Sequence, residues 1–287
     1  MIMPAYLYFF GIPLLKSILP AWLTGYEPPL PEYGPEPEPQ DAMVAWGYTL
    51  AKWVGWAMLI GLMMMLMIWS KQESILYVPN QPIQYVHENP ARYRSPEERD
   101  MKYKEMKLRT KEGLNLQGWF MHQHDEPEKY STIVFFHENA GNIGLRLDWF
   151  ELMYKRMKTN IICVAYRGYS KSEGETTQEN LLADVDVIVE YCKNEKLINQ
   201  DKVFLFGRSL GGAVAIHTLR RLEQKGEYYF KGAVIENTFT NISSMADAIF
   251  PMFKLIPWIK KQMLRLKWES DLQVPHIETP LFYISGD

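Results

Sequence analysis

A serine between two glycines is the residue whose type and spacing most clearly permit chemistry in this chain. It stands at position 209 in a G-x-S-x-G pattern, GRSLG at 207–211. Four apolar residues at 203–206 precede the pattern, and a second apolar run follows at 213–216. We therefore expect a buried strand, a sharp turn carrying Ser209 and a buried helix, which together are typical of a nucleophile elbow. A serine hydroxyl in such a turn can attack a carbonyl carbon.

The neighbours of Ser209 would support this chemistry. We expect Gly207 and Gly211 to leave room where a Cβ atom would collide with the adjoining strand and helix. The backbone N–H of Leu210 would lie at a helix N-terminus, where negative charge is favoured, so we expect it to stabilise a developing oxyanion. A serine nucleophile also needs a base, an acid that orients the base, and a second oxyanion donor.

The second oxyanion donor conventionally comes from the loop after the third strand. Here that loop is HENAGN at 137–142, at the carboxyl end of an expected strand at 132–136, where open α/β sheets bind ligands. His137 opens the loop, and we expect it to brace the loop by a hydrogen bond rather than to act as the base. His217 lies two helical turns beyond Ser209 and is interpreted as a core or surface residue whose hydrogen bonds are satisfied.

Alternating strands and helices predict the fold class. Expected strands at 101–109 and 114–121 form an antiparallel hairpin around a turn at 111–113. Short apolar strands follow at 132–136, 161–165, 203–206, 233–235 and 281–284. The pattern indicates an α/β protein whose mostly parallel sheet carries helices on both faces. Residues 239–280 form an apolar, lid-like insert, which either covers the serine and leans on a membrane or packs as ordinary helices.

The helices between the strands are predicted from their apolar spacing. The helix after the third strand has an inner face made of Ile143, Leu147, Phe150, Tyr154 and Met157. A capping box at Thr176 and Glu179 opens the next helix, whose inner face is made of Leu181, Val185, Ile188 and Cys192. Arg167 and Arg208 are interpreted as braces for neighbouring loops.

The N-terminal third of the chain indicates attachment to a membrane. Residues 44–70 are predicted to form a transmembrane helix, because 53–70 is an uncharged run of eighteen residues and about 20 apolar residues span a bilayer core. Tryptophans lie toward the ends of this segment, as at a membrane interface. Residues 1–24 are interpreted as an apolar membrane-associated segment and 25–43 as an extended linker with six prolines and five acids. An irregular connector at 71–100 leads to the α/β domain.

The charges beside the helix suggest an orientation. The acidic linker before it and Lys71 after it favour the α/β domain on the cytoplasmic or matrix side. The anchor is a single pass, or a hairpin if the first 24 residues also span.

Composition excludes several other classes of function. The net charge is −3, so no nucleic acid or other polyanion is an expected partner. The two cysteines, Cys163 and Cys192, are interpreted as buried thiols and not as a disulfide framework. No spaced Cys/His cluster suggests zinc, so no metal and no cofactor are expected.

Four segments carry a resemblance to a known family. In order they are FFHENAGNIG, VAYRGYSKSEGE, FLFGRSLGGAVAIH and IENTF, and they resemble the α/β-hydrolase superfamily, most closely its membrane-anchored, peptidase S33-like serine hydrolases. The resemblance runs from Gln72 to the last residue. It implies an α/β-hydrolase fold over 101–287, with Ser209 as nucleophile and the N–H groups of Asn139 and Leu210 as the oxyanion hole. The family usually has glycine where Glu138 stands, so we expect this carboxylate to point away from the oxyanion hole.

The end of the sequence departs from the family pattern. The family's catalytic acid stands three residues after the glycine that is Gly286 here, and its histidine follows an eighth strand. The sequence stops at Asp287, which by its spacing is not that acid, and no histidine matches. We therefore expect the last strand and helix of the fold to be missing, with the chain continuing past residue 287 or a partner chain covering the apolar strand at 281–284.

Two main hypotheses of function follow. The first is a membrane-anchored serine hydrolase that cleaves ester or thioester bonds, with lipid-like acyl groups as candidate substrates, if the chain continues past 287. The second is a catalytically inactive hydrolase-fold subunit with a structural role in a membrane complex. A lipid-binding module is a weaker third possibility. Membrane lipid, an acyl substrate and other subunits of a membrane complex are the partners that these hypotheses imply.

Overall fold

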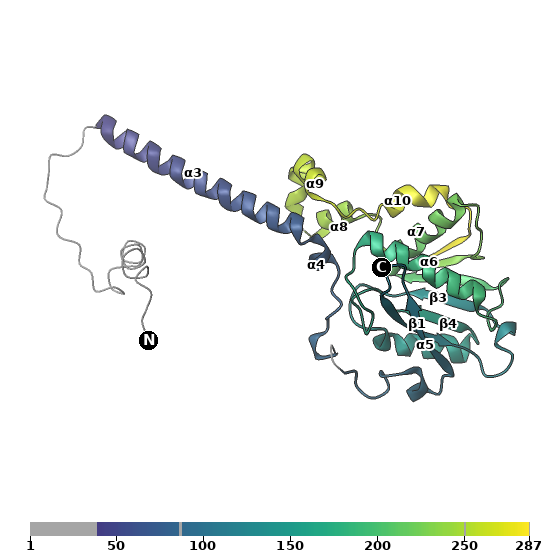
Figure 1. The fold of residues 1–287 in the computed structure, drawn as a ribbon. Helices are drawn as coiled ribbons and strands as arrows, with labels where there is room; N and C mark the ends of the chain where they lie inside the picture. Colours follow the sequence, from purple (N-terminus) through teal and green to yellow (C-terminus); the bar gives the residue numbers. More distant parts are fainter. Residues whose placement is uncertain (1–38, 86–87, 250, 287) are drawn as a thin grey trace, which may run out of the picture. The chain divides into compact units, whose positions relative to one another are not determined.

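The computed structural model describes residues 39–85, 88–249 and 251–286 (Figure 1). The predicted membrane-associated segment at 1–24 and residues 25–38 of the predicted linker lie outside the described residues. The chain divides into two compact units, Met1–Gly61 and Leu62–Asp287.

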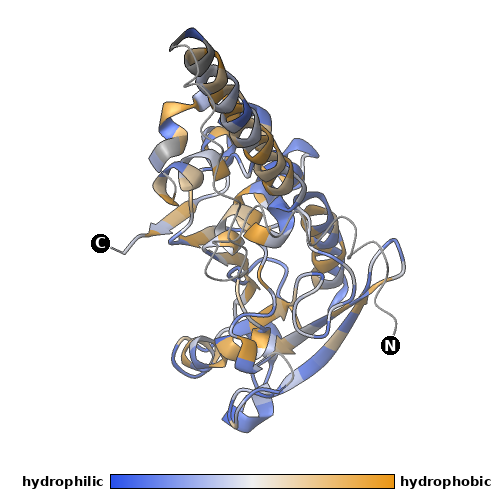
Figure 2. Ribbon diagram, turned by 90° about the vertical axis from the view of Figure 1, so that its left-hand side faces the viewer, coloured by the Kyte–Doolittle hydropathy of each residue, from blue (hydrophilic) through white to orange (hydrophobic). Residues whose placement is uncertain are grey.

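A long apolar helix, α3 (Pro39–Ser70), begins five residues before the predicted start of the transmembrane segment. Its part Met43–Ser70 is long and apolar enough to cross a membrane, with a mean hydropathy of 1.8 in its most apolar window of 18 residues. No residue in the most apolar part of this helix is buried. In Figure 2, where orange marks hydrophobic residues, α3 is mostly orange and pale. The short helix α4 (Gln72–Leu76) follows it.

The second unit is built on a seven-stranded sheet of order β1-β2-β4-β3-β5-β6-β7. The strands are β1 (Tyr103–Arg109), β2 (Asn115–Met121), β3 (Thr132–Phe136), β4 (Asn160–Val164), β5 (Val203–Arg208), β6 (Ala233–Glu236) and β7 (Leu281–Ile284). The β1–β2 and β2–β4 pairs are antiparallel. The β3–β4, β3–β5, β5–β6 and β6–β7 pairs are parallel. The predicted fold class, a mostly parallel sheet entered by a hairpin, is therefore confirmed.

Helices cover both faces of the sheet. Figure 1 shows α5 (Leu147–Arg156) on one face and α6 (Gln178–Asn194) with α7 (Leu210–Gln224) on the other. Strands β3 and β4 are buried along their whole length, as expected for strands enclosed between helices. Strand β7 forms one edge of the sheet, and its Phe282 and Tyr283 are exposed.

The insert between β6 and β7 is a chain of short helices. They are α8 (Ile242–Ile249), η6 (Pro251–Leu255), α9 (Pro257–Met263), α10 (Ser270–Gln273) and η7 (Val274–His276). These helices lie within residues 239–280, where the insert is predicted.

Two predictions about the ends of helices were wrong by less than one helical turn. The cap of α6 is Thr177, whose hydroxyl oxygen accepts the N–H of Asn180 at 3.1 Å. Thr176 instead donates its hydroxyl hydrogen to the carbonyl of Arg167, so the hydroxyl expected in the capping box holds the preceding loop. Met157 lies just beyond α5 and is exposed, because the helix ends at Arg156.

A buried ion pair ties the loop after β4 to α6. Arg167 and Asp184 have side chains only 5% and 4% exposed. The Nε and Nη2 atoms of Arg167 lie 2.7 and 2.6 Å from the two carboxylate oxygens of Asp184, and Nη2 also donates to Glu112 in the hairpin turn at 2.9 Å. The guanidinium therefore joins three segments, as the interpretation of Arg167 as a loop brace requires.

His217 of α7 contacts the insert. Its ring meets that of Trp268 edge to face, with centroids 5.2 Å apart. Its Nε2 atom is buried and has no hydrogen-bond partner among the described residues. Burial lowers the pKa of His217 to about 4. The expectation of satisfied hydrogen bonds was wrong for this atom, because the indole N–H of its aromatic neighbour donates to Tyr77 instead.

Replacing Arg167 by methionine is expected to lower the free energy of unfolding by about 3–5 kcal/mol, because it leaves the Asp184 carboxylate buried without a counter-charge. The double variant Arg167→Met/Asp184→Leu should recover most of this loss. Urea unfolding of the detergent-solubilised protein measures both values. A double variant as unstable as the single one would contradict the assigned cause.

The stability of the protein should depend on His217 in acid. The folded state holds the ring neutral down to about pH 4, whereas the unfolded ring takes up a proton near pH 6.5. This group therefore contributes stability above pH 6.5 that is lost as the pH falls toward 4, at up to about 1.4 kcal/mol per pH unit. His217→Leu should show a correspondingly shallower decline in urea unfolding across that range. Parallel declines in the two proteins would show that the ring does not stay neutral.

Candidate active site

Ser209 occupies the turn between β5 and α7 in a strained conformation. Its φ and ψ angles are 52° and −117°, outside the usual regions for a residue with a side chain. Three backbone contacts hold it there. Its N–H donates to the carbonyl of Glu236 at 2.9 Å, and its carbonyl accepts from the Gly212 N–H at 2.9 Å and the Thr238 hydroxyl at 2.7 Å. Strain of this kind persists only where the surroundings over-determine it, and it clusters at functional sites.

The turn is compact because two residues lack Cβ atoms. A Cβ on Gly207 would lie 2.3 Å from the carbonyl oxygen of Gly211. A Cβ on Gly211 would lie only 1.9 Å from the carbonyl oxygen of Phe136 at the end of β3. Both separations are far below van der Waals contact, so the start of α7 can approach β3 and β5 only with glycine at these positions.

The loop at 137–142 runs beside this helix start. Strands β3 and β5 are parallel neighbours, with Phe136 opposite Gly207. A Cβ on Gly211 would also lie only 3.0 Å from the carbonyl oxygen of His137. The loop that contains Asn139 and the helix start that contains Leu210 therefore adjoin at the carboxyl edge of the sheet, where parallel sheets place their ligands.

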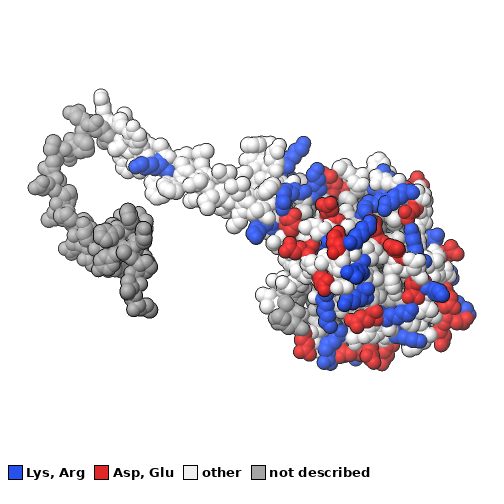
Figure 3. All heavy atoms as spheres, in the orientation of Figure 1, with Lys and Arg blue, Asp and Glu red and all other residues white. Residues whose placement is uncertain are grey.

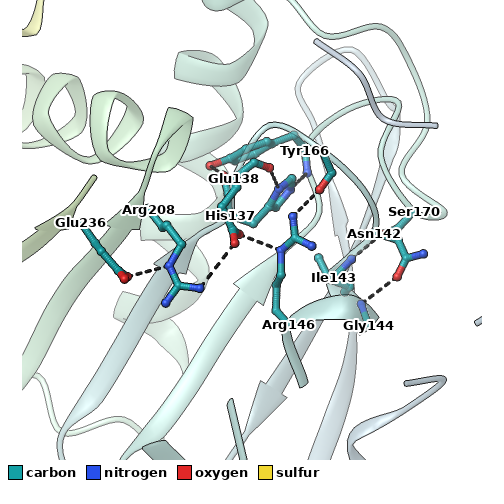
Figure 4. Close-up of polar contacts among 11 residues, drawn as sticks. His137, Glu138, Asn142, Ile143, Gly144, Arg146, Tyr166, Ser170, Arg208 and Glu236 are labelled. Carbon is teal, nitrogen blue, oxygen red and sulfur yellow. Dashed lines mark hydrogen bonds and ion pairs between the residues drawn. The ribbon is translucent and has the colours of Figure 1, made fainter. Parts of the chain in front are cut away.

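His137 braces this loop with both ring nitrogens (Figure 4). Nδ1 donates to the carbonyl of Glu138 at 2.7 Å, and Nε2 accepts the N–H of Tyr166 at 3.1 Å. The Tyr166 hydroxyl donates back to the His137 carbonyl at 3.0 Å, and the two rings stack. Burial, with the nearby Arg146 charge, lowers the pKa of His137 to about 3. The ring is thus neutral with its lone pair engaged, and it has no free nitrogen with which to accept a proton from Ser209.

Glu138 is held by two guanidinium groups (Figure 4). Its carboxylate lies 2.7 Å from Nε of Arg146 and 3.5 Å from Nη1 of Arg208. Arg208 also donates from Nε to Glu236 at 2.6 Å, so it joins the loop after β3 to the end of β6. These contacts give the negative charge of Glu138 fixed counter-charges, and they match the interpretation of Arg208 as a brace.

The segment just after α3 contacts the same loop, which the sequence patterns did not predict. Val78 forms an isolated parallel bridge with Ala140. The side chain of Asn139 donates to the carbonyl of Leu76 and accepts the hydroxyl of Tyr169 at 2.8 Å. The side chain of Asn139 therefore anchors the loop. No local pattern signals this contact, because it joins residues more than 60 positions apart.

A cleft of about 390 Å³ lies between the carboxyl ends of β6 and β7 and the insert. Residues after β6 and β7 line it together with the insert, among them Asn237, Thr238, Phe239, Val274 and Tyr283. Thr238 joins the cleft to the turn, because its hydroxyl donates to the carbonyl of Ser209.

No side chain within the described parts of the chain is hydrogen-bonded to the Ser209 hydroxyl. The same residues contain no group of three His, Cys, Asp or Glu side chains that could hold a metal. Asp287 lies outside the described residues.

Gly211→Ala is expected to lower the free energy of unfolding by about 3 kcal/mol or more, because the new methyl group meets backbone that cannot move aside. Gly232→Ala is the matched control, since its Cβ would meet only ordinary contacts of 3.4 Å and longer. Thermal unfolding of the two variants and the parent tests this difference. Equal melting temperatures for the two variants would show that the turn is not close-packed.

Comparisons with known proteins place the chain in a family. The sequence model of the family described as serine aminopeptidase, S33, matches residues 131–279, more than half of the chain. The protein bem46 of Schizosaccharomyces pombe is 31% identical over 241 residues, which cover 84% of this chain and 77% of bem46. The α/β hydrolase domain-containing protein WAV2 of Arabidopsis thaliana is 30% identical over 75% of this chain and 70% of its own.

Solved structures share the fold. An α/β hydrolase from Vibrio vulnificus superposes with a TM-score of 0.54 at 18% identity, covering 64% of this chain and 63% of its own. The esterase Pf2001 of Pyrococcus furiosus superposes with a TM-score of 0.51 at 17% identity, covering 66% of this chain and 71% of its own. With its parallel sheet, its strained Ser209 turn and these matches, the chain belongs to the α/β-hydrolase superfamily, in the serine aminopeptidase S33 family.

Proposed function

We propose that this protein is a membrane-anchored serine hydrolase that cleaves carboxylic ester or thioester bonds, with Ser209 as the nucleophile. The observation that carries the proposal is the strained turn of Ser209 at the start of α7, with backbone angles of 52° and −117°. A turn of this kind lifts a serine hydroxyl out of the sheet edge and toward a substrate. The cleft that Thr238 links to this turn has the apolar side chains of Phe239 and Val274 in its lining, which suits an acyl chain.

In this mechanism the Ser209 Oγ attacks the acyl carbon, and its proton passes to a base. The tetrahedral oxyanion accepts hydrogen bonds from the backbone N–H groups of Leu210, at the N-terminus of α7, and of Asn139. Collapse expels the alcohol or thiol with a proton from the base, and water then releases the acid from the acyl-enzyme. His137 is not that base, because it uses both ring nitrogens to brace the loop.

Two observations support attachment to a membrane. Met43–Ser70 is long and apolar enough to span a bilayer. A relative from Saccharomyces cerevisiae, YNL320W, is named a membrane protein and is 27% identical over 67% of this chain and 64% of its own. The α/β domain would then stand on the cytoplasmic or matrix side, since Lys71 directly follows the helix.

A second candidate function is a non-catalytic subunit of a membrane complex. It is favoured by the Ser209 hydroxyl, which has no base among the described residues, and by the exposed apolar side chains of the edge strand β7. An exposed edge strand is a template for pairing with another chain.

Fluorophosphonate labelling of the membrane-extracted protein separates the two candidates, because only an activated serine reacts readily. The hydrolase reading predicts labelling that disappears in Ser209→Ala and persists in Ser244→Ala, a change at an exposed serine in α8. Hydrolysis of acyl esters and thioesters should fall about 10³-fold or more in Ser209→Ala only. An unlabelled parent protein would favour the non-catalytic subunit, and labelling retained in Ser209→Ala would reject Ser209 as nucleophile.

A further inference from the structure

The insert is tied to the residues that directly follow the apolar helix. The buried side chain of Gln72 donates to the carbonyl of Met263, and its oxygen accepts the N–H groups of Arg265 at 2.9 Å and Leu266 at 3.4 Å. One side chain thus satisfies one backbone group at the end of α9 and two in the strap, which is the segment 264–269 that follows α9. Such contacts hold the strap at a fixed distance from the end of α3.

Two further contacts of Arg265 strengthen this connection, and we refer to Gln72 and Arg265 together as the clamp. Its guanidinium forms an ion pair with Glu73 and lies over the ring of Trp69, 4.8 Å from the centroid. Trp69 is the next-to-last residue of α3, where a spanning helix would place an aromatic residue at the membrane–water interface. The insert therefore lies at that interface if α3 spans a bilayer, a condition that rests on the membrane attachment proposed above.

The outer surface of the insert has the composition of an interfacial segment. Residues 249–267 contain five Lys or Arg and no Asp or Glu. Leu255 is 83% exposed and Trp258 is 72% exposed. Single exposed apolar residues are ordinary on soluble proteins. Here two large ones stand three residues apart, within a basic stretch beside an apolar helix.

Three of the four lysines in this stretch form no ion pair with the described residues. Lys254, Lys261 and Lys267 are exposed, and none has a carboxylate partner within residues 39–85, 88–249 and 251–286, whereas Lys260 pairs with Asp247. Figure 3 shows that the surface of α3 is almost uncharged, whereas blue and red side chains are interspersed over the α/β domain. Exposed lysines close in sequence to exposed Trp and Leu are typical of segments that lie on anionic bilayers.

We propose that the insert docks on the surface of an anionic lipid bilayer. Leu255 and Trp258 enter the headgroup region, and Lys254, Lys261 and Lys267 face lipid phosphates. The clamp of Gln72 and Arg265 presents this surface, so docking needs no rearrangement of the sheet or of the Ser209 turn.

A depth-sensitive probe on the full chain in lipid vesicles tests the proposal. The variant Leu255→Cys is labelled with the fluorophore NBD, and Cys163 and Cys192 do not compete because both are fully buried. The matched probe is Leu152→Cys, an exposed leucine in α5. In vesicles that contain phosphatidylserine, the probe at 255 should shift to shorter wavelength and lose emission to doxyl-labelled lipid. The probe at 152 should do neither. Equal quenching at the two positions would overturn the proposal.

A second experiment tests the contribution of the lysine charges and uses the same quenching measurement. Each lysine near an anionic surface contributes a factor of about five to docking. The triple variant Lys254→Gln/Lys261→Gln/Lys267→Gln should therefore reduce quenching at 255 to the level seen in vesicles of phosphatidylcholine alone. Quenching that depends neither on phosphatidylserine nor on the lysines would overturn the assignment of an anionic surface.

Separate measurements distinguish failure of this proposal from failure of the proposed function. Flotation with phosphatidylcholine vesicles reports the anchor, and a chain that does not float would remove the membrane attachment and the docking surface together. Fluorophosphonate labelling reports Ser209 and is independent of the depth of residue 255.

Discussion

The close approach of α7 to the ends of β3 and β5 is the constraint on which the rest of the structure depends. It exists because Gly207 and Gly211 carry no Cβ atom, so the first turn of the helix nearly touches the carbonyl of Phe136. The same approach forces Ser209 into its strained backbone conformation. It also brings a helix N-terminus against the loop after β3, which concentrates backbone N–H groups at one point of the sheet edge.

Charge around this point is arranged to keep the loop fixed. Glu138 places a negative charge in this loop, and Arg146 and Arg208 lie close enough to its carboxylate to balance that charge. His137 contributes no charge at all, since burial keeps its ring neutral. A rigid loop whose carboxylate is already paired can hold N–H groups toward a developing anion without first reorganising.

The residues at 72–78 connect parts of the protein that are far apart in sequence. Gln72 holds the strap after α9, Tyr77 accepts the indole N–H of Trp268 at 3.0 Å, and Val78 pairs with Ala140 of the loop beside Ser209. The segment that follows the apolar helix is thus part of the site's framework as well as its tether.

The sequence by itself determined the strand order along the chain, the Ser209 turn and the apolar helix, because these depend on local spacing of apolar residues and on glycines inside a short motif. It placed the strands at 132–136 and 281–284 at the observed bounds. Only the tertiary structure decided the partners of long polar side chains. Asn139 binding to Leu76, Gln72 to the strap, and Arg208 to Glu138 and Glu236 all join residues far apart in sequence. Such contacts follow from how the sheet and helices pack, and a single sequence carries no periodic signal for them.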